Sequence, residues 1–216
     1  MQKSFLQGNR KIDVLRDINL SIEKGKTLAI LGKSGSGKTT LLSILSGIEK
    51  SDAGSVIFNG EDITNYTQEQ LTKVRSQSIG VIFQQFHLIE HLNALENVSL
   101  PLEILGDKNA VQTSLALLEA VGLSDRASHF PAQLSGGEKQ RVAIARAMAI
   151  KPALLLADEP SGSLDEETGE KIMDLLFNLV RENDMSMILV THETELAKKC
   201  DNTSSLELGI LNQSDK

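Results

Sequence analysis

The hydrophobic positions of the chain fall mostly into short runs, and these runs predict the strands of a sheet. Residues 18–22 alternate apolar and polar side chains, which is typical of a half-buried strand. Residues 27–31 and 153–157 are almost wholly apolar and predict strands that are buried on both faces. Asn59-Gly60 is a turn signal that closes another apolar run. Further strands are expected at 55–58, 79–83 and 186–190.

Between these strands the apolar positions take helical spacing, first at residues 41–48. Strands that alternate with helices predict an α/β fold whose mostly parallel sheet is covered on both faces. Residues 86–148 contain no convincing strand, so we expect a helical subdomain inserted in the α/β core. Further helices are expected at about 110–121, 136–150, 166–182 and 193–200.

Composition narrows the classes of protein that this fold could represent. The 216 residues suffice for one α/β domain, and a hydrophobic content of 40% with a mean hydropathy of −0.11 is ordinary for a globular protein. No apolar run approaches the roughly 20 residues of a membrane helix, and the first residues lack the apolar core of a signal peptide. We therefore expect the chain to stay in the cytosol and to reach a membrane only through a partner.

Charge and cysteine content exclude further classes. The net charge of −7 and the sequence pI of about 5.2 argue against a general nucleic-acid binder, which would carry a basic face. The single cysteine, Cys200, permits no internal disulfide and suits a reducing compartment. A buried, inert thiol is favoured over a reactive one at this position.

Residues 32–39 match the phosphate-loop pattern G-x-x-x-x-G-K-[ST]. The glycines let backbone N–H groups face the phosphates, Lys38 can reach the β- and γ-phosphates, and Thr39 can offer its hydroxyl to Mg²⁺. The alternative is a plain glycine turn, but the loop follows a predicted strand and opens a predicted helix, which favours a nucleotide site. The residues expected to bind the nucleotide here are Gly32, Lys33, Ser34, Gly35, Ser36, Gly37, Lys38, Thr39 and Thr40.

Two carboxylates, Asp158 and Glu159, end the apolar strand predicted at 153–157. A strand end beside a phosphate loop would bring Asp158 near the magnesium through water, and Glu159 could polarise the attacking water. Two acids at the surface end of a strand are the alternative. The phosphate loop in the same chain favours the catalytic interpretation.

Residues 134–138, Leu-Ser-Gly-Gly-Glu, precede the helix predicted at 136–150. Ser135 can cap this helix, and the exposed N–H groups of its first turn can bind an anion. Taken alone, the four polar residues would indicate only a structural cap.

With the phosphate loop about a hundred positions earlier, these motifs resemble the ATP-binding subunits of ABC transporters over nearly the whole chain. The resemblance implies a single domain, 1–216, with a RecA-like P-loop NTPase core of residues 1–85 and 149–216. N-terminal antiparallel strands would accompany the core, and the inserted helical subdomain 86–148 would carry the signature. Two subunits would close head to tail as a homodimer on ATP binding. The residues expected to contact the other subunit's nucleotide are Ser135, Gly136, Gly137 and Glu138.

The resemblance gives further residues their roles. Gln84 would contact Mg²⁺ and the attacking water, and His192 would hold the γ-phosphate. Asp165 lies in a segment that crosses the dimer interface. Phe5 stands where the family usually has an aromatic residue stacked on adenine, although a core phenylalanine is the alternative. The catalytic residues expected for ATP hydrolysis are Glu159, His192, Gln84 and Lys38, and the metal-binding residues are Thr39, Gln84 and Asp158.

The chain departs from the family pattern at a few positions. Lys139, Ser161 and Ser163 replace residues that are usual there, but none of these changes removes a catalytic group. The N-terminus is short for the family, which leaves open whether the adenine pocket is complete. At the C-terminal edge, Leu208-Gly209 stands where the family often has Asp-Gly, so the comparison is weakest there.

Residues 89–98 and 130–135 resemble the lipoprotein-releasing and macrolide-exporter group, which includes an exporter ATPase of unknown substrate. This group pairs the ATPase with a permease of few helices and a large extracytoplasmic domain. The chain would then lie on the cytoplasmic face of the inner membrane, with its coupling surface near residues 85–105. The cargo and the identity of the partner do not follow from the sequence.

Two other functions share these motifs. A cell-division ATPase would signal through a related membrane partner and transport nothing, and its sequence would look the same. A soluble ABC ATPase of translation or DNA repair would carry two cassettes or a long coiled coil. This chain has one cassette and no heptad run, which disfavours the soluble class.

Overall fold

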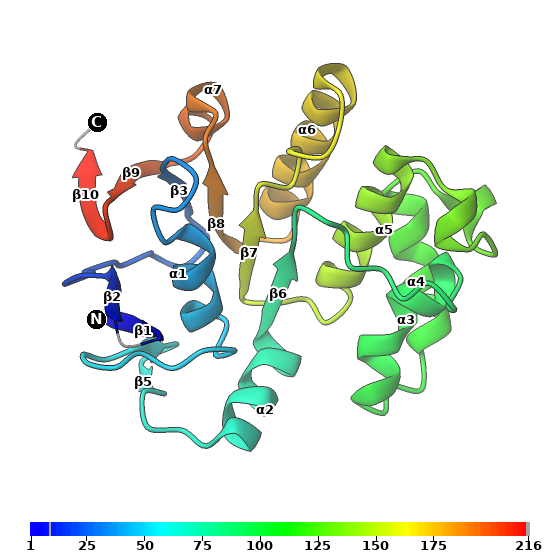
Figure 1. The fold of residues 1–216 in the computed structure, drawn as a ribbon. Coiled ribbons are helices and arrows are strands. Elements are labelled where there is room, and N and C mark those ends of the chain that lie inside the picture. Colours follow the sequence, from blue (N-terminus) through cyan, green and yellow to red (C-terminus); the bar gives the residue numbers. More distant parts are fainter. Residues whose placement is uncertain (9, 215–216) are drawn as a thin grey trace. The chain divides into compact units, whose positions relative to one another are not determined.

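The computed structural model describes residues 1–8 and 10–214. Contacts between Cα atoms divide the chain into two compact units. Unit 1 comprises Met1–Arg75 with Ser186–Lys216, and unit 2 comprises Ser76–Met185. Helix α2 (Gln68–Ser78) runs across the boundary. Each unit is described by itself below, and Figure 1 labels the elements in chain order.

Unit 1 is built around strand β3 (Thr27–Leu31), which is the expected apolar run. It pairs in parallel with β8 (Ser186–Thr191) on one side and with β9 (Asn202–Glu207) on the other. Strand β10 (Ile210–Ser214) joins β9 in antiparallel fashion. All six residues of β8 are buried, as the absence of polar alternation predicts for a strand covered on both faces. The carboxyl ends of β3 and β8 therefore lie side by side, with Leu31 opposite Thr191.

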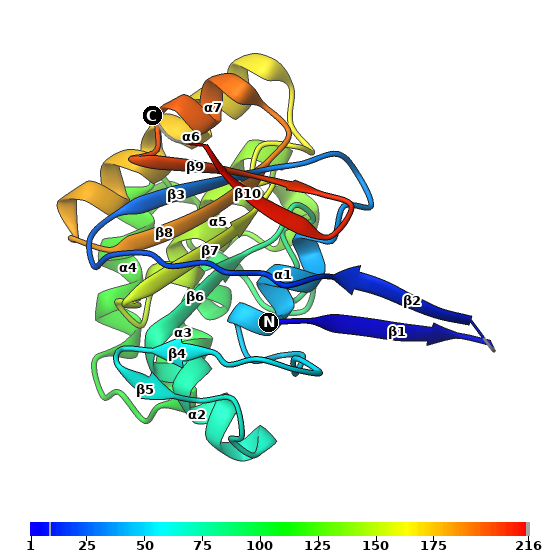
Figure 2. The same ribbon diagram turned by 90° about the vertical axis from the view of Figure 1, so that its left-hand side faces the viewer.

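Two short helices follow these strand ends, namely α1 (Lys38–Leu45) and α7 (Thr194–Lys198). An antiparallel hairpin of β1 (Lys3–Gln7) and β2 (Arg10–Leu15) precedes β3, as Figure 2 shows. A second small hairpin joins β4 (Ile57–Phe58) to β5 (Glu61–Asp62). Its turn is the expected Asn59-Gly60, whose two residues both have left-handed φ angles of 51° and 82°.

The strand expected at 18–22 is wrong, because these residues belong to no strand. Their side chains do alternate in burial, with Ile18 buried and Asn19 exposed. However, the backbone N–H of Ile18 donates to the carbonyl of Met1 at 2.9 Å and not to a strand ladder. The alternation therefore reported which side chains face inward, and it did not report strand pairing.

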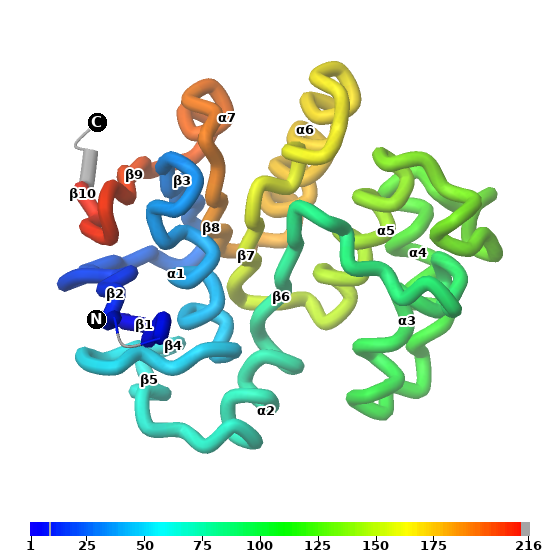
Figure 3. Tube along the Cα trace, viewed as in Figure 1, coloured from blue at the N-terminus to red at the C-terminus, as the bar shows by residue number. Residues whose placement is uncertain are grey.

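Unit 2 contains the parallel pair β6 (Ile79–Ile82) and β7 (Leu154–Asp158), with Ile82 opposite Ala157. The chain between them is helical and has no strand, as expected for residues 86–148. Figure 3 shows α3, α4 and α5 as neighbouring rods, and α6 follows β7. The helices are α3 (Ala94–Ile104), α4 (Ala110–Ala120), α5 (Gly136–Met148) and α6 (Glu166–Glu182), with short 3₁₀ turns at Ser124–Arg126 and Pro131–Gln133.

The amphipathic helices of unit 2 bury the faces that their spacing predicts. In α6 the buried positions include Ile172, Met173 and Leu176, which are at most 1% exposed. Asp165 caps this helix by accepting a hydrogen bond from the Thr168 N–H at 3.0 Å. Chain compactness is a different criterion from the predicted division into core and inserted subdomain, so those boundaries stay a prediction. Among the described residues, no helix is both long and apolar enough to cross a membrane.

Candidate nucleotide site and signature helix

The phosphate loop connects the buried strand β3 to the first residue of α1. Two of its glycines, Gly35 and Gly37, have φ angles of +79° and +104°, which side-chain-bearing residues rarely adopt. At Gly32 the reason for glycine is space, since a Cβ there would lie 2.7 Å from the Leu206 carbonyl oxygen. Gly37 occupies the N-cap position of α1 and has no side chain to cap it. The N–H groups at the start of this helix are therefore available to an anion.

Lys38 is buried and folds back over the loop. Its Nζ donates to the carbonyl oxygens of Gly32 at 2.8 Å and Lys33 at 3.1 Å. Beside it, the buried Ser36 hydroxyl has no hydrogen-bond partner among the described residues. A buried polar atom without a partner is costly, by about 1–3 kcal/mol, and a phosphate oxygen would satisfy it. Thr39 and Thr40 follow in the first turn of α1, where Thr39 is exposed.

A hollow of about 650 Å³ opens on this loop, and we call it the phosphate-loop hollow. His192, which directly follows β8, lines it together with Thr194. The β9–β10 turn forms another wall and contributes the exposed Leu208. Unit 1 thus brings the expected His192 to the same hollow as the loop, because the parallel strands β3 and β8 end at the same edge. The described residues that line the hollow are Leu31, Gly32, Lys33, Ser34, Gly35, Ser36, His192, Thr194, Ser205, Leu206, Glu207 and Leu208.

Phe5 lies on the β1–β2 hairpin and is not among these lining residues. Its ring is 41% exposed, and across the hairpin it is paired with Ile12. The alternative of a core phenylalanine is therefore wrong. Whether the exposed ring stacks on adenine stays a prediction.

Unit 2 carries the expected Gln84, Asp158 and Glu159. Gln84 follows β6, and the two acids lie at the end of β7, so the parallel pair brings all three to one edge. Glu159 adopts a left-handed φ of 45°, which is rare for a residue with a side chain and common at functional sites. The following turn is close to Gln84, since a Cβ at Gly162 would lie 2.9 Å from Gln84 Nε2. Ser163 completes the contact by donating its hydroxyl to the Gln84 carbonyl at 3.0 Å.

The signature residues form the start of α5. Ser135 is the N-cap and accepts a hydrogen bond from the Glu138 N–H at 3.2 Å, while Glu138 accepts one from the Ser135 N–H at 2.8 Å. This backbone hydrogen bond lowers the pKa of Glu138 against the effect of burial, and Arg126, 3.0 Å away, adds to the lowering. Gly137 is required for space, because a Cβ there would lie 2.6 Å from Thr168 Cγ2.

Arg146, near the other end of α5, is a residue that sequence reasoning missed. Its guanidinium donates to the carbonyl oxygens of His87 at 2.7 Å and Phe86 at 2.9 Å, so it holds the loop that follows Gln84. Phe86 and His87 both have left-handed φ angles, 26° and 46°. Burial lowers the pKa of the Arg146 guanidinium. The only sequence signal was a charged residue in the otherwise apolar stretch around residue 146.

A second hollow, of about 330 Å³, lies along this loop and is called the Gln85–Leu88 hollow. Two of the positions at which the chain departs from the family pattern, Lys139 and Ser163, line it. Its lining residues are Gln85, Phe86, His87, Leu88, Glu90, Pro131, Lys139 and Ser163.

A phosphate loop with a histidine in its hollow, two acids at a strand end and a capped Leu-Ser-Gly-Gly-Glu helix define an ATP-binding cassette. The comparisons agree, because the family model described as "ABC transporter" matches residues 15–162. The chain belongs to the ABC transporter family and is an ATPase subunit of it.

The relatives narrow this membership. The uncharacterized ABC transporter ATP-binding protein YbbA of Escherichia coli K12 is 46% identical over 99% of this chain and 94% of its own length. The lipoprotein-releasing system ATP-binding protein LolD of Saccharophagus degradans is 46% identical over 98% of this chain and 93% of its own length.

A solved structure agrees with the fold. The dimeric post-hydrolysis structure of the ATP-binding cassette MJ0796, bound to ADP and Pi, matches with a TM-score of 0.91 and 38% identity. The match covers 100% of this chain and 95% of that one. The predicted α/β fold, with its mostly parallel sheet and N-terminal antiparallel strands, is thereby confirmed, and so is the expected binding of ATP.

Proposed function

We propose that two copies of the chain close head to tail around ATP and drive a membrane permease. The observation that carries the proposal is the presence in one chain of a phosphate loop and of a separate, capped helix start that begins with Ser135. Each offers backbone N–H groups to an anion, and one nucleotide can use both if they come from different subunits. The dimeric structures of MJ0796 support this arrangement.

Within this dimer the loop and its hollow would bind the triphosphate. Lys38 would exchange the carbonyl oxygens of Gly32 and Lys33 for phosphate oxygens, and His192 would hold the γ-phosphate from the same hollow. Glu159 would orient the attacking water. Ser135, Gly136, Gly137 and Glu138 would approach from the other subunit, with Asp165 at the interface. The reaction is then phosphoryl transfer to water through positioning and electrostatics.

The chain's donor set fits magnesium. Among the described residues, no group of three or more His, Cys, Asp or Glu side chains could hold a metal on its own. Mg²⁺ commonly takes one or two carboxylates together with substrate phosphates and water, and it prefers oxygen ligands. Thr39, Gln84 and Asp158 offer a hydroxyl, an amide oxygen and one carboxylate. When bound, the ion would offset the charge that develops on the phosphates.

The partner is proposed to be a permease with few helices and a large extracytoplasmic domain, as in the group that includes LolD. The chain would lie on the cytoplasmic face of the inner membrane through this partner. The Gln85–Leu88 hollow is the proposed docking place, because it adjoins Gln84 and lies in the expected coupling region 85–105. Lipoprotein release or the export of a small molecule would be the task, with motion transmitted across the membrane.

The proposal is tested by isolating Glu159→Gln from detergent-solubilised membranes in ATP and identifying its partners by mass spectrometry. We expect recovery of a few-helix membrane protein with a large outer domain, and little recovery in ADP. The variant Lys139→Glu, whose charge reversal lies in the hollow, should lose this partner, whereas Lys108→Glu, in the exposed loop before α4, should keep it. Recovery of division proteins would favour the cell-division function, and recovery of no membrane protein would contradict the proposal.

A further inference from the structure

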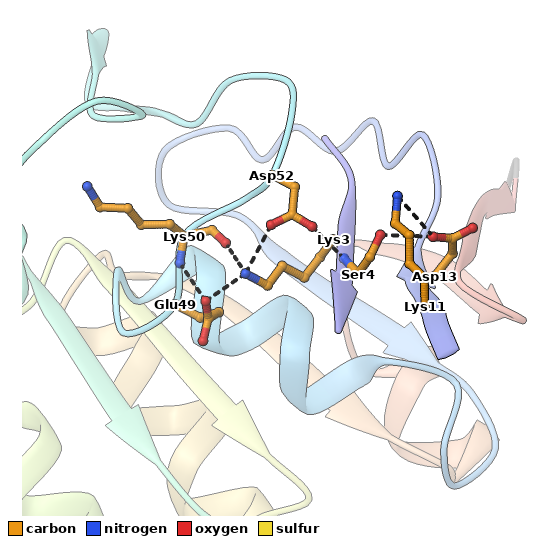
Figure 4. Close-up of polar contacts among 7 residues, drawn as sticks. All are labelled: Lys3, Ser4, Lys11, Asp13, Glu49, Lys50 and Asp52. Carbon is orange, nitrogen blue, oxygen red and sulfur yellow. Dashed lines mark hydrogen bonds and ion pairs between the residues drawn. The ribbon is translucent and has the colours of Figure 1, made fainter. Parts of the chain in front are cut away.

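Lys3 is a buried lysine on a strand whose later residues are largely exposed. Its side chain is 9% exposed, and its Nζ lies 2.7 Å from Glu49 Oε1, 2.8 Å from the Lys50 carbonyl oxygen and 3.2 Å from Asp52 Oδ1 (Figure 4). An ammonium group has three N–H donors, and here each has an acceptor. The Lys3 side chain is therefore held in one place.

The backbone around Lys3 reinforces the attachment. The Ser4 N–H donates to Asp52 Oδ2 at 2.7 Å, and Gln2 and Ala53 form a β-bridge. Burial opposes the charge of Lys3, but the hydrogen bonds and charges of Glu49 and Asp52 outweigh it and raise the pKa of the ammonium group. The start of β1 is thus tied to residues 49–53 by both side chains and main chain.

Residues 49–53 follow the helix that the phosphate loop opens. Helix α1 ends at Leu45, and the chain turns at Gly47 with a φ of +68° before it reaches Glu49. At the other end of α1, the hairpin lies against the loop itself, since a Cβ at Gly37 would lie 2.9 Å from Leu15 Cδ2. Leu15 is the ladder partner of Lys3. The base of the hairpin is therefore attached at both ends of the phosphate-binding helix.

Phe5 lies two residues beyond Lys3 and points to the same side of the strand. Lys3 Nζ lies 5.1 Å from the centroid of the Phe5 ring. The ring is 41% exposed and so has surface left to offer a ligand, while the neighbouring Leu6 is 79% exposed near the hairpin tip. Lys3 is accordingly the fixed group on which the Phe5 ring rests.

We propose that Lys3 is a positioning residue for nucleoside recognition, which holds the Phe5 ring at a set place relative to the phosphate loop. This inference rests on the proposed stacking of adenine on Phe5. Because Lys3 acts through the ring, it affects the part of ATP that carries the base and leaves the phosphates to the loop. Loss of Lys3 should therefore resemble loss of the ring and should not resemble loss of Lys38.

The test compares the dissociation constants of ATP and of inorganic tripolyphosphate, both with Mg²⁺, by titration calorimetry. Lys3→Met keeps the apolar stem and removes the ammonium group, and it should weaken ATP binding about tenfold, within the range that base stacking supplies. Phe5→Leu should weaken it at least as much. The double variant should bind ATP no worse than Phe5→Leu alone, and tripolyphosphate should bind all of them within about twofold of the parent.

Lys11→Met is the matched control, because Lys11 lies on the same hairpin with its side chain 69% exposed and only a loose 3.8 Å contact to Asp13. It should leave both dissociation constants unchanged. If Lys3→Met does not fold, Asp52→Asn loosens the same cluster from its exposed side and should show the same selective loss.

Equal weakening of ATP and tripolyphosphate, or additive effects in the double variant, would show a general structural role and overturn the inference. Unchanged ATP binding in Lys3→Met and Asp52→Asn, with a normal effect of Phe5→Leu, would reject this inference alone. Unchanged ATP binding in Phe5→Leu would reject the adenine contact itself and with it the role of Lys3.

Discussion

At the scale of single residues, the site combines side chains chosen for their chemistry with a backbone that the sequence does not reveal. Glu159 was expected from its place after an apolar strand, but its left-handed φ of 45° was not. Such a conformation costs about 1–3 kcal/mol for a residue with a side chain and persists where the surroundings fix it. The contact between the Gly162 turn and Gln84 belongs to those surroundings.

We expect Glu159→Gln to bind ATP within about threefold of the parent and to hydrolyse it at least about a hundredfold more slowly, since the amide cannot accept the proton of the water. Single-turnover hydrolysis with radiolabelled ATP measures the rate, and equilibrium dialysis measures binding. Glu182→Gln, at the exposed end of α6, is the control and should hydrolyse normally. Normal hydrolysis by Glu159→Gln would remove this carboxylate from the mechanism.

At the scale of elements, α5 is the most informative segment, because its two ends have different tasks. Its first turn presents the signature through the Ser135–Glu138 capping box. Near its last turn, Arg146 binds the loop after Gln84. The cap could be predicted from the residue types, whereas the Arg146 contact depends on two strained loop residues that no local pattern indicates.

The capping box makes the stability of α5 depend on pH. The pKa of Glu138 is lowered on folding, so its carboxylate stabilises the fold above the unfolded-state pKa of about 4.3, and this stabilisation is lost as the pH falls through the folded-state pKa. Glu138→Gln keeps a hydrogen-bond acceptor and removes the charge. Its urea midpoint should be lower than that of the parent at pH 7, by about 0.3–1 kcal/mol, and should converge with it well below pH 4. A difference that persists unchanged at low pH would contradict this account.

Arg146→Lys should lower the rate of ATP hydrolysis several-fold with little change in ATP affinity. A lysine ammonium is a point charge and cannot reproduce the guanidinium's fixed fork to the carbonyls of Phe86 and His87. The loop that carries Gln84 would then be less well held. The turnover number and the dissociation constant are measured side by side, with Arg181→Lys on the exposed face of α6 as control. Loss of affinity and turnover in equal measure would instead indicate general unfolding.

At the scale of the whole molecule, patterns predicted what is buried better than what is paired. Strands β3, β7 and β8 were expected because short, almost wholly apolar runs are typical of strands that are covered on both faces. The β1–β2 hairpin was missed in detail because most of β2 is exposed, and 18–22 was wrongly taken as a strand because alternation reports burial. Helix α3 carried a readable signal, the capping box of Asn93 and Glu96.

The site shows the same division. The phosphate loop and the signature could be predicted because each needs fixed residue types at fixed spacing, as the crowded Gly32 and Gly137 illustrate. The supporting contacts of Lys3, Ser163 and Arg146 could not, because they join residues far apart in the chain. Nothing local encodes the second subunit, although the separate signature requires one.

The most direct test of the head-to-tail site is the solution mass of the chain, measured by light scattering with and without ATP. Glu159→Gln should be a monomer without nucleotide and a dimer in ATP. Adding Ser135→Arg, which places a bulky cation at the signature, should leave ATP binding intact and keep the protein monomeric, whereas adding Ser128→Arg, at an exposed serine of the same helical region, should not. A dimer that forms equally well with Arg at position 135, or a Glu159→Gln chain that stays monomeric in ATP, would contradict the account.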